Sequence, residues 1–449
     1  MQQSLAEKYG SPVPRYTSYP TAPHFHEGVD EEKYRQWLKG LKGTDTLSLY
    51  LHVPFCDRLC WFCGCHTKQT LKYAPITTYI EQLLAEIDLV AAAIENKPKV
   101  TGVHFGGGSP SMLTPDDLGR LVARLREKFS FGDRPEISIE VDPGDVTPER
   151  VEGMVKAGLS RVSIGVQDFD EKVQEAINRP QSFELTRNVV EQMRGAGVHS
   201  LNLDVLYGLP YQTEDTLRKT IEQVVLLKPD RVALFGYAHV PWMKKHQNLI
   251  EEDKLADING RFSQAQLAAQ LLVNAGFVRI GLDHFARFDD TLAVAARTGR
   301  LRRNFQGYTD DPASALIGLG ASSIGETKQG YVQNIVGTGR YMEEVKAGKI
   351  PVARGVELSQ EDIARRWVIE SLMCDMVLAR AEAIKHLGDE AAGLLAEAAQ
   401  LAERDEDGLF VAEDDGFRVT ETGRPFVRVL AAHFDTYLNK GKGRHSAAI

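Results

Sequence analysis

Four of the five cysteines lie in one short stretch, as Cys56, Cys60, Cys63 and Cys65. Three soft thiolates at spacings of three and two residues can each hold one iron of a 4Fe-4S cubane, which leaves the fourth iron an open position. The alternative is a zinc site with Cys65 or His66 as fourth ligand, but structural zinc sites usually draw their ligands from two separated pairs. The spacing therefore favours an iron–sulfur cluster held by Cys56, Cys60 and Cys63.

Glycines and polar residues recur where predicted strands end. Residues 106–110 read Gly-Gly-Gly-Ser-Pro after the second strand, Glu140 and Asp142 end the third, Gln167 ends the fourth and Asp204 lies in the fifth. Glycines let a ligand approach the backbone closely, and a phosphate loop is disfavoured because no Gly-Lys-Ser/Thr follows. Any one of these residues alone is as readily an ordinary strand end. Their recurrence at the same end of successive strands predicts a shared pocket.

The elements that must position these residues alternate between strand and helix. Six apolar, strand-like stretches are separated by segments with helical period, at residues 47–53, 100–105, 136–141, 161–166, 201–206 and 231–236. Such alternation with short connections predicts parallel strands joined by right-handed crossovers. The count favours a barrel or partial barrel, although an open doubly wound sheet fits the periodicity equally well. The cysteine loop follows the first strand, at the end where parallel barrels build their active sites.

The flanking segments differ in character from this α/β region. Residues 1–35 are rich in proline and aromatic residues, and we expect an ordered arm that lies over the active site. Residues 36–355 form the predicted catalytic domain. Residues 356–449 are predicted to form a helix-rich, winged-helix-like C-terminal domain, and because they lack a basic stripe we expect a packing or lid role instead of DNA binding.

The bulk properties exclude several classes of function. The 449 residues carry a net charge of -9, which argues against nucleic-acid binding because that needs a basic surface. The N-terminus has no basic-then-apolar signal pattern, and no apolar run approaches the roughly 20 residues that span a bilayer. We therefore expect a cytoplasmic protein that binds neither membrane nor nucleic acid.

With these residues assembled, the chain resembles a known family. The Cys-x3-Cys-x2-Cys spacing, with Phe62 before the third cysteine, resembles that of radical S-adenosylmethionine (SAM) enzymes. Nearly the whole chain is similar to the oxygen-independent coproporphyrinogen III oxidases. The residues that carry this resemblance are Pro-Arg-Tyr-Thr-Ser-Tyr-Pro-Thr at 14–21, Cys-Gly-Cys at 63–65, and stretches at 139–143, 163–169, 207–210, 283–287, 304–309 and 434–438.

The resemblance implies a fold and a set of site residues. The fold would be α/β, a partial (β/α)6 TIM-like radical SAM barrel with an N-terminal arm and a helix-rich C-terminal domain. Two SAM molecules would bind in one site. The cluster-bound SAM would contact Tyr50, Gly107, Glu140 and Ile324. The second SAM would contact Phe62, Gly108, Ser109, Gln167, Arg179, Asp204 and Ala238. Phe305 and Gln306 would lie near the substrate, and the family requires Cys65 although it is not a cluster ligand. The catalytic residues would then be Tyr50, Cys65, Glu140 and Gln306.

The resemblance also implies the reaction. One electron from the cluster would cleave SAM to methionine and a radical that removes hydrogen from a propionate of coproporphyrinogen III. Loss of carbon dioxide and a further electron would leave a vinyl group, and two such events would give protoporphyrinogen IX. The electron donor would be flavodoxin-like or ferredoxin-like, and we expect a monomer.

Two other functions share the cysteine motif. One is a haem-binding radical SAM chaperone without decarboxylase activity, with His24, His26, His239 and His284 as candidate axial ligands. The other is a radical SAM enzyme that opens or methylates haem. The arm and Cys65 favour the oxidase, because related haem-trafficking proteins typically lack both.

Overall fold

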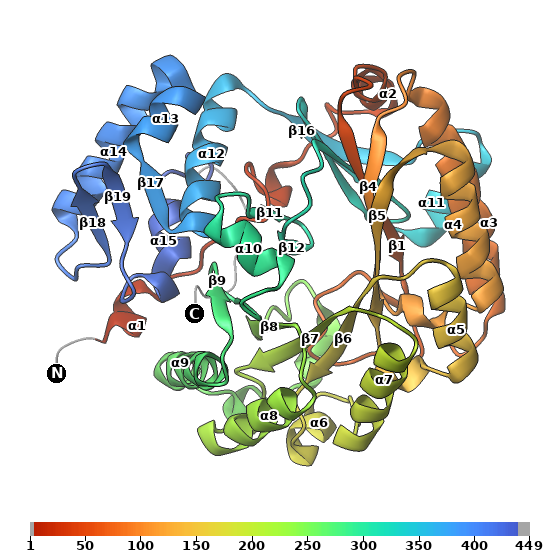
Figure 1. Ribbon diagram of the computed structural model, residues 1–449, viewed down its shortest axis with the longest axis horizontal. Coiled ribbons are helices and arrows are strands. Elements are labelled where there is room, and N and C mark those ends of the chain that lie inside the picture. Colours follow the sequence, from red (N-terminus) through yellow and green to blue (C-terminus); the bar gives the residue numbers. More distant parts are fainter. Residues whose placement is uncertain (1–3, 439–449) are drawn as a thin grey trace.

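The computed structural model describes residues 4–438 and contains a curved central sheet covered by helices on its outer face (Figure 1). Six strands run parallel side by side: β1 (Thr46–Val53), β4 (Lys99–Gly107), β5 (Ser130–Val141), β6 (Arg161–Gln167), β7 (Ser200–Tyr207) and β8 (Arg231–Gly236). They match the six predicted strands and confirm the α/β partial barrel. A further strand, β13 (Ala315–Leu319), lies parallel to β1 and was not predicted.

Antiparallel strands extend the sheet at both edges. Beyond β13 come β14 (Ile324–Thr327), β15 (Gly330–Asn334) and β16 (Val352–Glu357), and beyond β8 come β10 (His284–Ala286) and β9 (Val278–Ile280). The strand order thus runs from β16 at one edge to β9 at the other, among the described residues. The sheet therefore remains a partial barrel.

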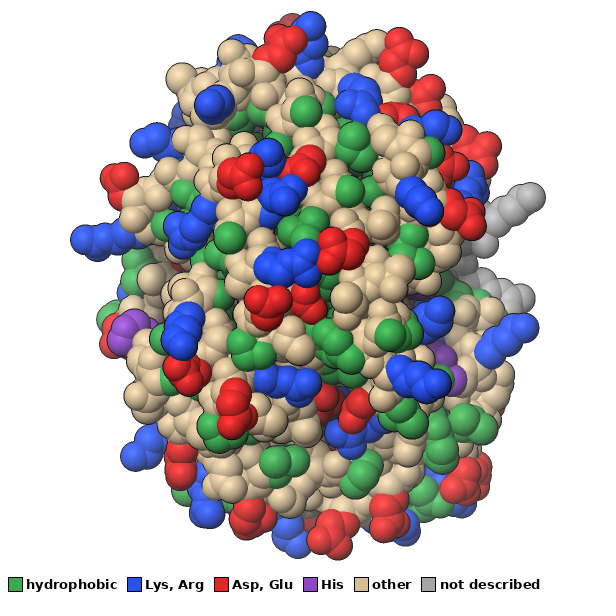
Figure 2. All heavy atoms as spheres, turned by 90° about the vertical axis from the view of Figure 1, so that its right-hand side faces the viewer, with side chains coloured by type: hydrophobic (Ala, Val, Ile, Leu, Met, Phe, Trp, Pro, Cys, Tyr) green, Lys and Arg blue, Asp and Glu red, His purple; other side chains and the backbone are tan. Residues whose placement is uncertain are grey.

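Crossover helices cover the outer face of the parallel strands. They are α3 (Ala74–Ala93), α4 (Pro115–Lys128), α5 (Pro148–Lys156), α6 (Glu171–Ala176), α7 (Phe183–Gly195) and α8 (Glu214–Leu226). Two of these helices, α4 and α5, begin alike: the hydroxyls of Thr114 and Thr147 each accept a backbone N–H as an N-cap ahead of a proline. On the face that α3 and α4 present, acidic and basic side chains are interspersed (Figure 2), and Arg120 pairs with Glu81 and Arg124 with Asp88.

The alternation along each strand separates an apolar outer face from a polar lumen. In β1, Leu47, Leu49 and Leu51 are fully buried in the cluster that the crossover helices complete. Successive strand residues point to opposite faces, so Tyr50 lies on the lumen side, where its ring stacks on His104 of β4. The same alternation turns strand-end polar residues inward, toward one another.

The remaining elements are short or belong to the ends of the chain. Near the barrel lie α2 (Glu31–Lys39), β2 (Phe55–Cys56), β3 (Lys68–Gln69), α9 (Ile258–Asn274), α10 (Thr291–Arg297), β11 (Arg302–Asn304), β12 (Gly307–Thr309) and α11 (Thr338–Lys346). Across residues 4–438, no helix combines the length and apolar character that crossing a bilayer requires.

The C-terminal part has a core of its own. It contains α12 (Gln360–Asp375), β17 (Val377–Ala379), α13 (Arg380–Leu387), α14 (Ala391–Arg404), β18 (Phe410–Glu413), β19 (Gly416–Val419) and α15 (Val427–Ala432). The three strands form a small antiparallel sheet in the order β17-β19-β18. Stacked Phe410 and Phe417 belong to a hydrophobic cluster separate from that of the barrel. This part is helix-rich, as the sequence predicts.

The N-terminal arm is ordered and packs into that second core. Its first helix, α1 (Leu5–Tyr9), lies near α15 (Figure 1), and Tyr16 and Tyr19 are buried among C-terminal residues. The Tyr16 hydroxyl donates to Asp435 at 3.0 Å. Arg428 of α15 donates to the carbonyl oxygen of Pro14 at 3.0 Å. The first part of the arm, up to Tyr19, therefore packs into the C-terminal core. Further along, His26 pairs with Gly355 of β16 through two backbone hydrogen bonds of 2.8 and 2.9 Å, which join the arm to the edge of the barrel sheet.

Candidate active site

The cysteine loop is fitted against the glycine run that follows β4. The Gly108 N–H donates to the Val53 carbonyl at 2.9 Å, and the Ser109 N–H donates to the Phe55 carbonyl at 2.7 Å. A Cβ at Gly108 would stand only 2.5 Å from the Phe55 oxygen. Glycine is therefore required at 108, because any side chain would push the cysteine loop away from β4.

Three side chains from the segment after β8 hold the other side of this loop. Lys244 Nζ donates to the carbonyl of Cys65 at 2.8 Å, and Gln247 Nε2 donates to that of Phe62 at 3.0 Å. His246 Nε2 lies 2.7 Å from the Cys63 carbonyl. Sequence reasoning missed these residues, and no local signal could have found them, because they are about 180 positions from the cysteines.

The cysteines and the strand-end residues line one cavity of about 490 Å³. The predicted site residues that it brings together are Cys56, Cys60, Cys63, Cys65, Phe62, Gly107, Gly108, Ser109, Glu140, Gln167, Arg179, Asp204 and Ala238. They come from the ends of six different parallel strands and their following loops, which is the arrangement typical of a barrel active site.

Four predicted site residues lie outside the lining of this cavity: Tyr50, Phe305, Gln306 and Ile324. Phe305 packs edge-on against the ring of Tyr331, and its place near the substrate stays a prediction. Tyr50 lies in the lumen next to this cavity. A Cβ added at Gly106 would stand 3.0 Å from both the Tyr50 ring and Glu140, so these two side chains lie close to the same backbone position. Ile324 packs instead with an apolar cluster that includes Tyr331. Gln306 is exposed and lines a separate hollow with residues from the amino ends of the strands, such as Ser48. The structure does not bring Gln306 to the cysteines, and its catalytic role stays a prediction.

Comparison with known proteins identifies the family. The model of the radical SAM superfamily matches residues 50–224. An oxygen-independent coproporphyrinogen III oxidase from Paracoccus denitrificans is 44% identical over the full length of both chains, and one from Helicobacter pylori strain 26695 is 38% identical over 98% of each. The chain belongs to the oxygen-independent coproporphyrinogen III oxidases. The solved coproporphyrinogen III oxidase of Escherichia coli, a radical SAM enzyme, superposes with a TM-score of 0.90 at 38% identity, over 94% of this chain and 98% of that one. Membership of this superfamily implies a 4Fe-4S cluster and SAM.

The thiols of this oxidase fit an iron–sulfur cluster. Burial raises the pKa of Cys56 and of Cys60, whereas the interaction with Cys65 lowers the pKa of Cys63 to about 7. Thiolates packed this closely need a cationic group to offset their charge. Within residues 4–438, no group of three or more His, Cys, Asp or Glu side chains is arranged around a single-ion position. A cubane needs no such convergence, because each cysteine binds a different iron.

Two acidic groups of the oxidase face the cavity in different electrostatic states. Glu140 accepts from the Gly107 N–H at 3.0 Å. Burial opposes its ionisation, but His104 and the Gly107 N–H together lower its pKa below the usual value. Asp204 accepts from Ser163 at 2.9 Å, and burial raises its pKa to about 6. An ionised Glu140 on the wall of the cavity is suited to hold a cationic group such as an ammonium.

The histidines considered as haem ligands have other contacts in the structure. His239 Nδ1 lies 2.8 Å from the Tyr237 hydroxyl, and His284 Nδ1 lies 2.7 Å from Asp283. His24 packs against the ring of Tyr437. These contacts are those of ordinary packed histidines.

Proposed function

We propose that this enzyme converts two propionate side chains of coproporphyrinogen III to vinyl groups, giving protoporphyrinogen IX by radical SAM chemistry. One observation carries the proposal beyond the family likeness. The cysteine loop, the glycine run and carboxylates from two strands line a single cavity of about 490 Å³, which has room for large ligands next to the cluster position.

Cys56, Cys60 and Cys63 would hold the cluster, and the chain's other polar groups would bind two SAM molecules. The bound cluster and SAM supply the radical that starts the reaction. We assign the cluster-bound SAM to Tyr50, Gly107, Glu140 and Ile324. We assign the second to Phe62, Gly108, Ser109, Gln167, Arg179, Asp204 and Ala238. Support comes from the shared cavity, which includes nine of these eleven residues.

The chain's own residues position ligands and exclude water in this proposal. Glu140, ionised and anchored on the Gly107 N–H, would bind the ammonium of a methionine moiety. Arg179 would offer its guanidinium to a carboxylate, since the same side chain already lies against Cys60 and Asp142. Phe62 would screen the cluster from solvent, which favours radical chemistry over side reactions.

The proposal extends to partners and location. Gly64 and Cys65 are exposed at the tip of the cysteine loop, so a flavodoxin-like or ferredoxin-like donor can approach the cluster there. We further propose that the enzyme works as a monomer in the cytoplasm.

An anaerobic assay tests this function. Reconstituted enzyme, given SAM, a reductant and coproporphyrinogen III, should release protoporphyrinogen IX and two carbon dioxide per substrate. The Cys60→Ala variant, prepared in parallel, should give neither. Cleavage of SAM with both propionates left intact would contradict the proposal. Tight retention of haem without turnover would favour the alternative hypothesis of a haem-binding chaperone.

A further inference from the structure

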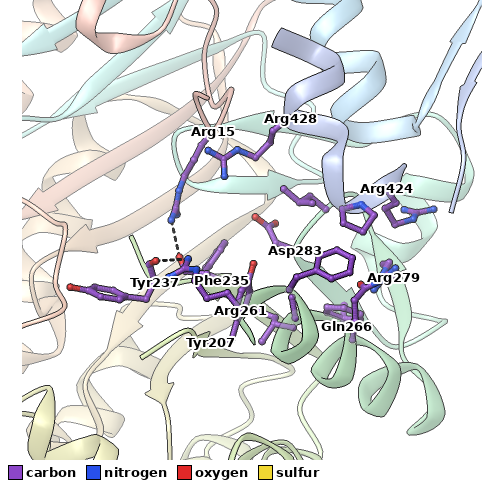
Figure 3. Close-up of a pocket in the computed structure, with 18 of the residues that line it drawn as sticks. Arg15, Tyr207, Phe235, Tyr237, Arg261, Gln266, Arg279, Asp283, Arg424 and Arg428 are labelled. Carbon is purple, nitrogen blue, oxygen red and sulfur yellow. Dashed lines mark hydrogen bonds between the residues drawn. The ribbon is translucent and has the colours of Figure 1, made fainter. Parts of the chain in front are cut away.

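A second cavity, lined by arginines, lies where the barrel, the C-terminal core and the arm meet (Figure 3). Six arginines line it: Arg15 from the arm, Arg261 from α9, Arg279 from β9, Arg303 from β11, and Arg424 and Arg428 from the C-terminal part. One carboxylate, Asp283, is among the described lining residues. Guanidinium groups gathered from five parts of the chain indicate a site for anions.

Backbone contacts orient several of these arginines toward the cavity. Arg15 donates to the carbonyl of Gly236 at 3.1 Å, and Arg261 donates to that of Tyr237 at 2.7 Å, both drawn as dashed lines in Figure 3. Arg428 donates to carbonyls of the arm. Carbonyl oxygens accept hydrogen bonds but carry no charge. Among the described lining residues, six arginines thus stand against one carboxylate.

Two acids, Asp283 and Glu421, lie close to these arginines. Asp283 stands 3.8 Å from Arg303 Nη1, and Glu421 pairs with Arg424 at 2.9 Å. The Nε atoms of Arg279 and Arg303 are buried without a hydrogen-bond partner. Burial and repulsion by neighbouring arginines lower the pKa of Arg428 to about 10. Buried donors without a partner are costly, and a bound anion would satisfy them.

The size of the cavity limits what can enter it. It encloses about 80 Å³, against about 490 Å³ for the cysteine cavity. A water molecule occupies about 30 Å³ in the liquid, so the arginine cavity has room for a carboxylate on a short side chain. A tetrapyrrole ring fits only in the larger cavity.

The two cavities share a wall. Arg15, Phe235, Gly236 and Tyr237 line both of them. A ligand in the cysteine cavity can thus extend a charged arm past Phe235 toward the arginines. Aromatic side chains at this wall suit the apolar body of such a ligand.

We propose that this arginine pocket binds one or two propionate carboxylates of the tetrapyrrole substrate. The propionates bound there are the ones that do not react while the substrate lies in that position. The inference rests on the proposed function, because it takes the substrate to be a tetrapropionate macrocycle. Four carboxylates distinguish this substrate from its two-carboxylate product. Anchoring the propionates far from the cysteines leaves those near the cysteines free to react.

Arg279→Gln is the most direct test, because Arg279 lines the cavity and its buried Nε has no hydrogen-bond partner among the described residues. The probe is coproporphyrin III, the stable oxidised form with four carboxylates, titrated anaerobically into the reconstituted enzyme while protein fluorescence is followed. Loss of one charge-assisted contact should weaken its binding about tenfold. Arg279→Lys, which keeps the charge, should weaken it less, and KM for coproporphyrinogen III should rise while kcat stays near that of the unmodified enzyme.

Arg218→Gln is the matched control. Arg218 is exposed on α8, away from both cavities, and the substitution changes the net charge equally. It should leave the dissociation constant within about twofold, since an isolated surface charge contributes little. Deuteroporphyrin IX, with two carboxylates, should lose less affinity than coproporphyrin III in Arg279→Gln. If Arg279→Gln fails to fold, Arg15→Gln, exposed and in the same cavity, takes its place.

The outcomes separate this inference from the proposed function. Unchanged affinity for coproporphyrin III in a folded Arg279→Gln or Arg15→Gln variant overturns the arginine pocket, whatever the enzyme's activity. An equal loss of affinity for both porphyrins also overturns it, because Arg279 would then not distinguish a porphyrin with four carboxylates from one with two. Arginine-dependent binding with no vinyl product supports the pocket and refutes the proposed reaction.

Discussion

Arg179 Nη1 donates to Asp142 Oδ2 at 3.0 Å and lies 3.5 Å from the Sγ of Cys60. Its Nη2 donates to the carbonyl of Gly165 at 2.9 Å, and the side chain is almost fully buried. One guanidinium thus links the cysteine loop to the ends of β5 and β6. Because Asp142 offsets its charge, it can remain ionised beside a cluster whose thiolates it also contacts.

Arg179→Gln should therefore impair both stability and function. Removing one partner of a buried ion pair leaves Asp142 uncompensated, which costs about 3–5 kcal/mol, and the thermal midpoint should fall. Arg179→Lys keeps the charge but lacks the two guanidinium nitrogens that contact separate partners, so we expect its thermal midpoint to lie between those of Arg179→Gln and the unmodified enzyme. Differential scanning calorimetry of the anaerobic enzyme measures this. Equal midpoints for Arg179→Gln and unmodified enzyme would show that the pair contributes nothing.

Substitutions should distinguish the cysteines that bind the cluster from Cys65, which does not. Cys60→Ala should abolish the brown absorption at roughly 400 nm that thiolate-ligated clusters show. Cys65→Ser should retain the absorption and the iron content while losing decarboxylation. Iron and sulfide analysis after anaerobic reconstitution checks both variants. Loss of the cluster in Cys65→Ser would make Cys65 a ligand and contradict its assigned role.

The contacts that hold the cysteine loop from behind should matter for the cluster's lifetime. Gln247 is fully buried, and its Nε2 donates to the carbonyls of Phe62 and Ala238. Gln247→Leu leaves both carbonyls without this donor, at a cost of about 1–3 kcal/mol, and should loosen the loop. We expect the variant to lose its cluster faster in air. The decay of the visible absorption over time measures this loss. Asn248→Leu, an exposed neighbour, is the control and should decay like the unmodified enzyme.

Glu86 of α3 should give the fold a distinct pH dependence. It is fully buried, it accepts from Tyr341 and from the Gly320 N–H, and burial raises its pKa from 4.5 to about 7. The folded state therefore holds its proton more tightly than the unfolded chain, so its contribution to stability falls as pH rises from about 4.5 to 7.

Glu86→Gln should remove that contribution. The difference in free energy of unfolding, unmodified protein minus variant, should decline by at most about 3 kcal/mol as the pH rises across this interval. Urea unfolding at several pH values measures the difference between the two proteins. A difference that stays constant with pH would mean that Glu86 does not titrate in this range.

The sequence alone determined the elements and the chemistry of the loop. Strand and helix periods are local patterns, so the six parallel strands and the helices between them could be predicted from neighbouring residues. Periodicity alone left open whether these strands form a partial barrel or an open sheet, and the structure shows the partial barrel. Cysteine spacing is also local, and parallel strands necessarily bring their carboxyl ends to one edge. The gathering of Glu140, Gln167 and Asp204 in one cavity followed from that rule.

Tertiary structure decided what depends on contacts distant in the sequence. Gln247 reaches the cysteine loop, Gln306 is placed away from it, and the arm packs into the C-terminal core through Tyr16, all because of how separate elements dock. The arginine pocket is the clearest case. Its charges come from the arm, the barrel edge and α15, and no spacing along the chain brings Arg15, Arg279 and Arg428 together. Periodicity predicts which face of an element is buried, but only packing of whole elements decides which distant faces meet.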